Sequence, residues 1–255
     1  MEMERNQRLV PASVQLSRRI LLYCAAALAA LVAGGCTTDA GQSLIILQNQ
    51  VPDDGCIISP SASNDFRSRG IIDVQASLGY IFTPVVQSQI LDDTNASTSR
   101  VISVGGADVE VSFPGGFFSA DEEASLRDAA LTRFSESLSG SVQPDLGTTS
   151  FAFVIVPQRL LDRIGAKLSP GDSVQASANV VVFGDMDGLS VESNPFNYSV
   201  DVCNGCMKIV RGDCATLPSS FEPSPGGECN DLQDVALECC TTGGVEVCPA
   251  IGTGA

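Results

Sequence analysis

Cysteine is the residue type with the greatest chemical potential in this chain, which holds ten cysteines and no histidine among its 255 residues. Thiol groups bind metals, exchange with other thiols or form disulfides, and the redox state of the compartment selects among these fates. An even number of cysteines set among Gly, Pro and Ser is typical of a disulfide framework. We predict structural disulfides, of undetermined connectivity, among eight residues: Cys56, Cys203, Cys206, Cys214, Cys229, Cys239, Cys240 and Cys248.

Cys203 and Cys206 form a CxxC pair, a spacing that also serves zinc sites and redox centres. The chain has no second CxxC and no histidine to complete a zinc site, so a structural disulfide is the first interpretation, and metal binding or redox chemistry are the alternatives. Cys56 stands far from the other seven cysteines, and we predict that it bonds to the C-terminal tail.

Three acids could bind a cation. Asp185 and Asp187 precede Gly188, with Glu192 nearby, and this spacing matches part of a calcium-binding loop. The flanking segments read as strands rather than the helices of an EF-hand, and Asp-Gly is a strong hairpin signal. A plain hairpin turn is therefore the favoured interpretation, and a weak metal site at Asp185, Asp187 and Glu192 is the alternative.

The missing histidine excludes Ser-His-Asp and Cys-His catalysis. The sequence also carries no GxSxG motif and no Gly-rich phosphate loop. We predict a protein that is not an enzyme and uses no cofactor. A hydrolase based on carboxylates or a Ser-Lys pair is a remote alternative.

The chain is acidic, with 30 Asp and Glu against 14 Lys and Arg and a formal net charge of −16. Such a surface repels phosphates, so nucleic acid is excluded as an expected partner. The acidity favours solubility or, alternatively, the binding of divalent cations.

An apolar segment lies near the N-terminus. Arg18 and Arg19 are followed by the apolar run Ile20–Val32. Small residues come next, and the segment ends at Cys36. A run of roughly 13 residues is short for a bilayer of about 30 Å but fits the hydrophobic region of a cleaved export signal. Export agrees with the predicted disulfides.

The end of this segment, Val32-Ala33-Gly34-Gly35-Cys36, resembles the lipobox of bacterial lipoproteins. The resemblance implies that residues 1–35 are removed, that Cys36 is lipidated, and that residues 36–43 form a tether. Thr37 is not the aspartate of an inner-membrane retention signal, which implies the outer membrane, on either its periplasmic or its outer face. An ordinary secretory signal or an uncleaved anchor are the alternatives.

A looser likeness covers VESNPFNYSVDVCNGC, which passes into the Cys-rich tail. This stretch is similar to Cys-rich lipoproteins of myxobacteria-like Gram-negative bacteria, a family without an assigned activity. We expect a non-catalytic structural or interaction role in the cell envelope, with attachment to the membrane through the acyl anchor and contacts to other envelope proteins. The alternative is a ligand- or divalent-cation-binding module of an envelope assembly.

The elements that must position these residues are mainly strands. Val174, Ala176, Ala178, Val180 and Val182 alternate with polar residues, the period of a half-buried strand. We predict an antiparallel, immunoglobulin-like sandwich over residues 44–202 and a disulfide-rich tail over residues 203–255. Two short helices are expected, at Asp121–Ala130 behind a capping box of Ser119 and Glu122, and at Pro157–Lys167. The predicted strands include Leu44–Gln50, a return strand at Cys56–Ser59, two strands around Gly105-Gly106, Thr149–Val156, Ser173–Phe183, Leu189–Glu192 and Pro195–Val202.

Overall fold

The computed structural model describes residues 42–91 and 100–249. By its internal contacts the chain divides into two units, Met1–Asp39 and Ala40–Ala255, and all described residues belong to the second. The predicted signal segment and Cys36 lie outside the described residues. Two names are used below: the body is residues 42–202 and the tail is residues 203–249.

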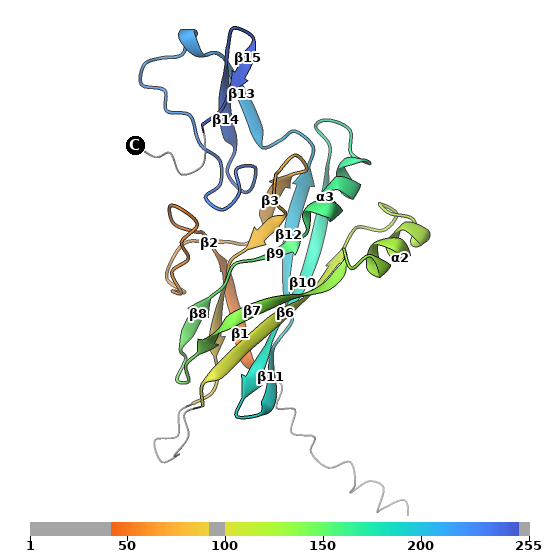
Figure 1. Cartoon of the computed structure of the whole chain (residues 1–255), viewed down its shortest axis with the longest axis vertical. Helices are drawn as coiled ribbons and strands as arrows, with labels where there is room; N and C mark the ends of the chain where they lie inside the picture. The colour runs from red at the N-terminus through yellow and green to blue at the C-terminus, as the bar shows by residue number, and fades with distance from the viewer. Residues whose placement is uncertain (1–41, 92–99, 250–255) are drawn as a thin grey trace, which may run out of the picture. The chain divides into compact units, whose positions relative to one another are not determined.

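The described chain is mainly β with two α-helices (Figure 1). The first strand begins two residues earlier than expected, inside the predicted tether. The strands of the body are β1 (Gln42–Gln50), β2 (Phe66–Arg67), β3 (Gly70–Asp73), β4 (Tyr80–Phe82), β5 (Pro84–Ser88), β6 (Ile102–Ser112), β7 (Arg133–Val142), β8 (Thr148–Ser150), β9 (Phe153–Val156), β10 (Ser173–Met186), β11 (Leu189–Ser193) and β12 (Phe196–Cys203, which reaches the first tail residue).

β10 lies at the centre of a ten-stranded sheet, where it pairs with β6, β11 and β12. The five alternating residues of the predicted strand, Val174 to Val182, are buried, because side chains of a strand point alternately to its two faces. β10 then turns into β11 through Asp187 and Gly188, which both have positive φ angles. That is the two-residue hairpin that the Asp-Gly pair predicts.

The expectation of a purely antiparallel sheet is wrong. β1 pairs with β11 in parallel, and β12 pairs with β3 in parallel. Parallel neighbours need long connections rather than hairpins, and here the partners are separated by about a hundred residues of chain or more. Alternation of apolar residues fixes which face of a strand is buried but not the direction of its neighbour, so the sequence pattern could not show this.

The segment around Gly105 and Gly106 forms one strand, β6, rather than two. Its pairing with β7 shifts register between Val104 and Gly106, which is how the strand absorbs the two glycines. A Cβ atom at Gly106 would lie 2.5 Å from the Phe183 ring. The glycine is therefore needed for close packing and does not break the strand.

Two further strand predictions are wrong. Thr149–Val156 divides at Phe151 into β8, which pairs with β5, and β9, which pairs with β4. Cys56–Ser59 is not a strand, since this turn contributes only a single bridge between Asp53 and Ile57. Cys56 has a positive φ of 61°, a conformation of turns rather than strands.

Both helices lie where they are expected. α2 (Ala120–Asp128) begins with the predicted capping box, in which Ser119 and Glu122 exchange hydrogen bonds with each other's backbone N–H. α3 (Gln158–Gly165) follows Pro157 and buries Leu160, Leu161 and Ile164. Among the described residues, neither helix has the length and apolar character needed to cross a membrane.

The tail forms a three-stranded sheet of its own from β13 (Lys208–Asp213), β14 (Leu237–Thr242) and β15 (Val245–Val247), with a short 3-10 helix at Cys214–Thr216. Its outer strands bury little, and Val245 is 67% exposed. Five buried tail residues join the apolar core of the body, and Cys248 packs against it in a partly buried position; the five are Cys203, Met207, Leu232, Leu237 and Cys239.

Candidate functional site

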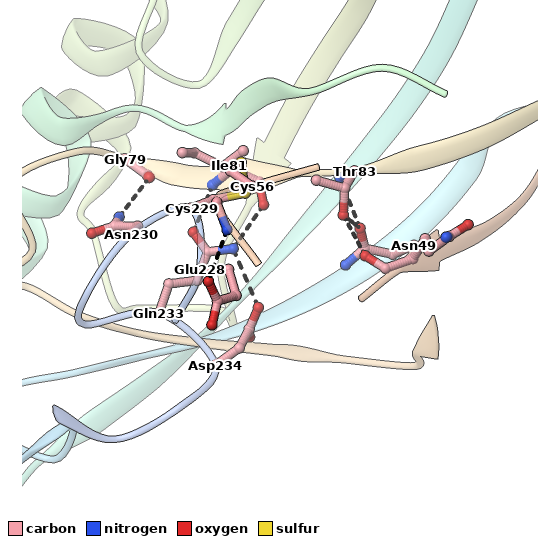
Figure 2. Close-up of a disulfide and its surroundings, with 12 residues drawn as sticks. Asn49, Cys56, Gly79, Ile81, Thr83, Glu228, Cys229, Asn230, Gln233 and Asp234 are labelled. Atoms are coloured by element: carbon pink, nitrogen blue, oxygen red, sulfur yellow. Dashed lines mark hydrogen bonds between the residues drawn. A yellow bond between two sulfur atoms is a disulfide. The ribbon is translucent and has the colours of Figure 1, made fainter. Parts of the chain in front are cut away.

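The most elaborate arrangement of polar side chains in the described chain joins the tail to the body. Residues 226–234, which we call the tail loop, lie against β3, β4 and the turn at residues 51–57. The Cys56–Cys229 disulfide bonds this loop to the turn covalently (Figure 2). Beside it, the Gly55 backbone N–H donates a hydrogen bond to Glu228 Oε2 at 3.1 Å.

Two amide side chains of the tail loop bind the backbone of the body. Gln233 accepts a hydrogen bond from Ile81 N–H at 2.9 Å and donates one to Ile81 O at 2.8 Å. This pairing copies the two bonds by which strands pair in an antiparallel sheet. Asn230 Nδ2 donates to the carbonyl oxygens of Leu78 and Gly79, both at 3.1 Å. The loop thus satisfies backbone groups of the segment around β4.

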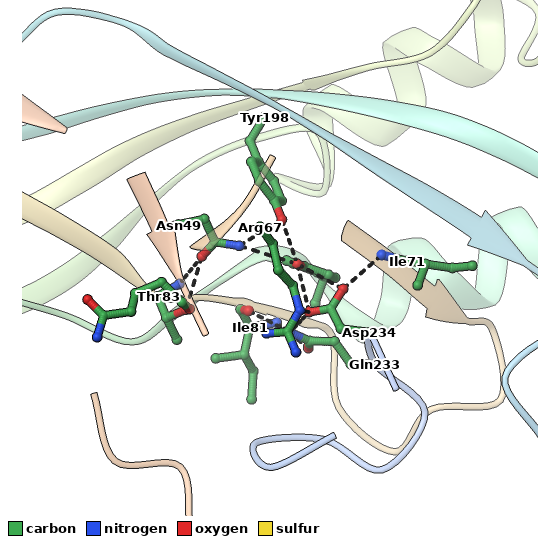
Figure 3. Close-up of polar contacts among 10 residues, drawn as sticks. Asn49, Arg67, Ile71, Ile81, Thr83, Tyr198, Gln233 and Asp234 are labelled. Atoms are coloured by element: carbon green, nitrogen blue, oxygen red, sulfur yellow. Dashed lines mark hydrogen bonds and ion pairs between the residues drawn. The ribbon is translucent and has the colours of Figure 1, made fainter. Parts of the chain in front are cut away.

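Asp234 ends the tail loop inside a buried polar network (Figure 3). Its carboxylate accepts hydrogen bonds from Ile71 N–H at 2.9 Å and from Tyr80 Oη–H at 3.0 Å. The Tyr80 hydroxyl lies 3.0 Å from the Tyr198 hydroxyl, which accepts a hydrogen bond from Asn49 Nδ2 at 2.7 Å. Polar groups from both ends of the chain therefore meet in one network under the tail loop.

Asn49 extends the network to Thr83, whose backbone N–H and hydroxyl both donate to Asn49 Oδ1. Asn49 is 2% exposed and Thr83 is 2% exposed. Buried polar groups are costly unless they are hydrogen-bonded, and these are. The network therefore holds β1, β4, β12 and the tail loop in a single arrangement.

Burial raises the pKa of the Asp234 carboxyl above its ordinary value, although hydrogen bonds and the charge of Arg67 act in the opposite direction. Arg67 Nε lies 3.7 Å from Asp234 Oδ2. Burial also raises the pKa of Tyr198 to about 12, and that of Tyr80 well above its usual value. Both phenols therefore stay protonated at neutral pH and act as donors.

The space beside this network is small. The cavity beside Arg67, Gln233 and Asp234 measures about 10 Å³, which is no more than a single water requires. The arrangement has titratable groups, but the cavity next to them is small. It fits a joint between two parts of the protein better than a catalytic centre. We call it the tail joint, comprising Cys56, Cys229, Asn230, Gln233, Asp234 and their partners.

All eight predicted cysteines form disulfides in the structure. Besides Cys56–Cys229, whose second member lies in the tail, the pairs are Cys203–Cys206, Cys214–Cys240 and Cys239–Cys248. Two of these pairs have a carboxylate close to both sulfur atoms: Asp73 lies beside Cys203 and Cys206, and Glu246 lies beside Cys239 and Cys248.

The structure does not bring the three acids of the calcium interpretation together. In the described part of the chain, Asp185, Asp187 and Glu192 do not form a group of ligand atoms within 4.8 Å of one another. Asp185 Oδ1 instead accepts a hydrogen bond from Gly188 N–H, as in a plain turn. Glu192 lines a polar cavity of about 500 Å³ with Glu110 and Arg133.

A third cavity, of about 350 Å³, lies between α2 and α3. Phe118 and Leu126 give it an apolar wall, and Arg163 and Lys167 lie at its side. Lys167 is paired with Glu122 at 2.9 Å and lies 5.2 Å above the Phe118 ring.

The amide, carboxyl and phenol groups of the tail joint carry no sequence motif, and they were not predicted. Asn49 and Gln50 end an apolar strand, which is a weak sign of buried amides. Gln233 and Asp234 look like ordinary loop residues in an acidic chain. Comparisons of this chain with protein-family models, with curated proteins and with solved structures gave no match.

Proposed function

We propose that this protein is an outer-membrane lipoprotein with a non-catalytic structural or interaction role in the cell envelope. Acyl chains on Cys36 would hold it to the membrane, and other envelope proteins would be its partners, without nucleic acid. Burial of acyl chains contributes about 0.8 kcal/mol per methylene, so more than one chain gives a lasting anchor. The proposal covers both the periplasmic and the outer face of this membrane.

The observation that carries the proposal is the tail joint. It combines a disulfide, paired amides and a buried carboxylate beside a cavity of only about 10 Å³. Such a construction suits a protein that keeps one stable conformation better than an enzyme that turns over substrate. Four disulfides among the described residues also support a site outside the cytosol, where thiols are otherwise kept reduced.

We further propose that the body is an immunoglobulin-like sandwich. Support comes from its single apolar core, from strands that bury one face, and from the short distances between strands along the chain. The parallel pairs at β1 and β3 distinguish it from the simplest form of that fold. A body of this kind presents sheet faces and loops for contacts rather than an active-site cleft.

Mass spectrometry of the N-terminus of the protein purified from native membranes tests the anchor. We expect the mature chain to begin at an acylated Cys36, and the Cys36→Ser variant to leave the membrane fraction. Cys24→Ser is the matched control, since that residue would be removed with the signal. A wild-type chain with an unmodified thiol at position 36 would refute the anchor, and protease treatment of intact cells then reports which membrane face is occupied.

The cavity between α2 and α3 favours a second function, that of a ligand-binding module. Its volume lies in the range of small-molecule sites, and its apolar wall with Arg163, beside the Lys167–Glu122 ion pair, suits an amphipathic anion. A short-chain fatty acid is a suitable probe. Binding to the wild type that the Arg163→Ala variant loses would support this function, whereas equal binding to both would contradict it. Calcium up to about a millimolar tests the cation alternative, which requires a rise in melting temperature.

A further inference from the structure

The Cys203–Cys206 disulfide lies where two parallel strands end side by side. Cys203 is the last residue of β12, and its register partner is Asp73, the last residue of β3. The Asp73 carboxylate and the two sulfur atoms all lie within 4.8 Å of one another, and Asp73 Oδ2 is 3.9 Å from Cys203 Sγ. A CxxC pair, which the sequence leaves open to several uses, is thus placed against a carboxylate by the parallel pairing of strands.

The two sulfur atoms of this disulfide differ in accessibility. Cys203 is 2% exposed, whereas Cys206 is exposed to solvent. Of the eight disulfide-bonded cysteines, all of which lie in the described residues, only Cys206 is exposed. Thiol–disulfide exchange starts with the attack of a thiolate on an accessible sulfur. Cys206 is therefore the sulfur at which an incoming thiolate would attack.

Asp73 is completely buried, with 0% of its surface exposed. Its oxygens accept hydrogen bonds from the backbone N–H groups of Gln75 at 3.0 Å and Met207 at 3.2 Å. Among the described residues, no Lys or Arg forms an ion pair with it. Two hydrogen bonds offset part of the cost of burying this charge, but no ion pair among the described residues does, and the carboxylate lies next to a disulfide sulfur.

The Cys203–Cys206 bond also differs from the other three disulfides in what it holds together. It spans a sequence separation of 3, against 173, 26 and 9 for the others. A link over so few residues removes little freedom from the unfolded chain. Opening it would leave the tail joined to the body through Cys56–Cys229.

We propose that Cys203–Cys206 is an exchangeable disulfide that oxidises the thiols of a partner, with Asp73 as the proton acceptor for Cys203. A partner thiolate attacks Cys206 Sγ, the Cys203–Cys206 bond breaks, and Cys203 leaves with the electron pair and is protonated by a solvent proton that Asp73 Oδ2 relays to it. A second partner thiolate then attacks the partner sulfur of the mixed disulfide and releases the Cys206 thiolate. The net result is two-electron oxidation of a dithiol to a disulfide and reduction of the Cys203–Cys206 pair to two thiols.

Asp73 is the group that exchanges the proton of the Cys203 thiol. In the reduced protein the Cys203 S–H faces the Asp73 carboxylate, and a carboxylate this close disfavours a second negative charge on the sulfur. When the pair is oxidised again, the Cys206 thiolate attacks an oxidising disulfide such as oxidised glutathione, which releases one half as a thiolate and leaves a mixed disulfide at Cys206. Cys203 then attacks Cys206 Sγ, its proton passes to Asp73 Oδ2, and the other half of the oxidant leaves as a thiolate. Asp73 thus contacts a reacting atom and serves as a general base in reoxidation.

Native reduction of the full-length protein tests the proposal. The oxidised protein is incubated, without denaturant, in a series of glutathione redox buffers; free thiols are then alkylated and located by mass spectrometry. We expect Cys203 and Cys206 to be labelled at the least reducing buffers, while the other six cysteines stay bonded. Simultaneous labelling of all eight, or earlier labelling of Cys214 and Cys240, would overturn the proposal.

Single variants separate the roles of the two sulfur atoms. With oxidised glutathione, the Cys203→Ser variant should form a mixed disulfide at Cys206 at least about tenfold faster than the Cys206→Ser variant forms one at Cys203, because only Cys206 is accessible. Equal rates would contradict the assignment of Cys206 as the attacked sulfur.

The Asp73→Asn variant tests the proton acceptor. Reoxidation of the reduced variant by oxidised glutathione should be about tenfold slower than that of wild type and should lose part of its pH dependence. Asp201→Asn, two residues before Cys203 on the same strand, is the matched control and should behave as wild type. If the reduced wild type instead binds Zn²⁺ tightly and resists reoxidation, Asp73, Cys203 and Cys206 are a metal site and the exchange proposal is wrong.

Discussion

The body and the tail reach stability through different means. Residues 71–202 contain no cysteine, and this part of the body is held by a continuous apolar core that includes Tyr80, Phe82 and Leu160. The tail carries seven of the eight disulfide-bonded cysteines and exposes much of its apolar surface, as Val245 and Val247 illustrate. A short, exposed sheet buries too little to fold alone, so covalent links replace burial there.

The tail joint is stabilised both by a covalent link and by noncovalent contacts. One of its links, Cys56–Cys229, constrains the unfolded chain, while Gln233 and Asp234 contribute hydrogen bonds that exist only in the folded state. This difference makes the contributions separable by mutation. The following predictions order them from the largest expected effect to the smallest.

Removal of the disulfide at the tail joint should have the largest effect. The double variant Cys56→Ser/Cys229→Ser opens a link with a sequence separation of 173. We expect the free energy of unfolding to fall by about 5 kcal/mol, since longer loops gain more entropy in the unfolded state. Denaturant unfolding followed by circular dichroism measures it. The double variant Cys239→Ser/Cys248→Ser, with a separation of 9, should cost about half as much; equal losses would show that the link acts through something other than chain entropy.

A cavity in the core of the body should come next. Leu160 on α3 is fully buried, and Leu160→Ala should lower the free energy of unfolding by about 3 kcal/mol. Leu189→Ala, at a residue that is 56% exposed, is the control and should change it by less than about 0.5 kcal/mol. A small loss at Leu160 would mean that the body, like the tail, relies on its links.

Loss of the paired amide should be smaller. Gln233→Ala leaves the backbone N–H and C=O of Ile81 without their partners in a partly buried place, which should cost about 2 kcal/mol. We expect faster protease cleavage in the tail as well as reduced stability in denaturant. Gln143→Ala, at an exposed glutamine of the body, should change neither quantity. Unchanged cleavage of the Gln233 variant would show that the disulfide alone holds the loop.

The helix cap of the body should contribute least among the single changes. Ser119→Ala removes the side-chain acceptor for the Glu122 N–H at the start of α2 and should cost about 1 kcal/mol. Ser119→Asp keeps an acceptor in that position and should restore the wild-type melting temperature. If both variants melt alike, the cap does not stabilise the body.

Acid should affect the two regions in opposite directions. The raised pKa of Asp234 means that the folded joint holds its proton more tightly than the unfolded chain, so its contribution to stability grows as pH falls through that pKa and is lost as pH rises. Hydrogen bonds from the Ser119 backbone and then Lys167 lower the pKa of Glu122 to about 2. Its contribution is present above pH 4.5 and is lost as pH falls toward 2.

Melting curves between pH 7 and pH 2 measure these two trends. Asp234→Asn should remove the gain on mild acidification, and Glu122→Gln should remove part of the loss below pH 4.5. Parallel pH profiles for wild type and both variants would contradict the assignment of these two carboxyl groups.

Local signals predicted well those elements that local interactions decide. The alternation in Ser173–Phe183, the Asp187-Gly188 turn and the Ser119–Glu122 capping box each describe contacts among neighbours in the sequence, and the structure confirms all three. The disulfide framework and the mainly β class were also readable from residue types. Thr149–Val156 shows the limit of this approach. Its two halves pair with different strands, and the sequence pattern does not indicate which strand is the partner of which half.

The sequence by itself determined that the tail needs disulfides, that the body needs a buried sheet face, and that histidine-based chemistry is absent. Only the tertiary structure decided which cysteines pair, that β12 and β3 run in parallel, and that Asp73 lies against Cys203. The tail joint was also decided by the tertiary structure alone, since Gln233 and Ile81 are 152 residues apart along the chain. The reason is physical: composition and periodicity report burial and local conformation, whereas contacts between distant residues depend on how the packed strands are arranged in space.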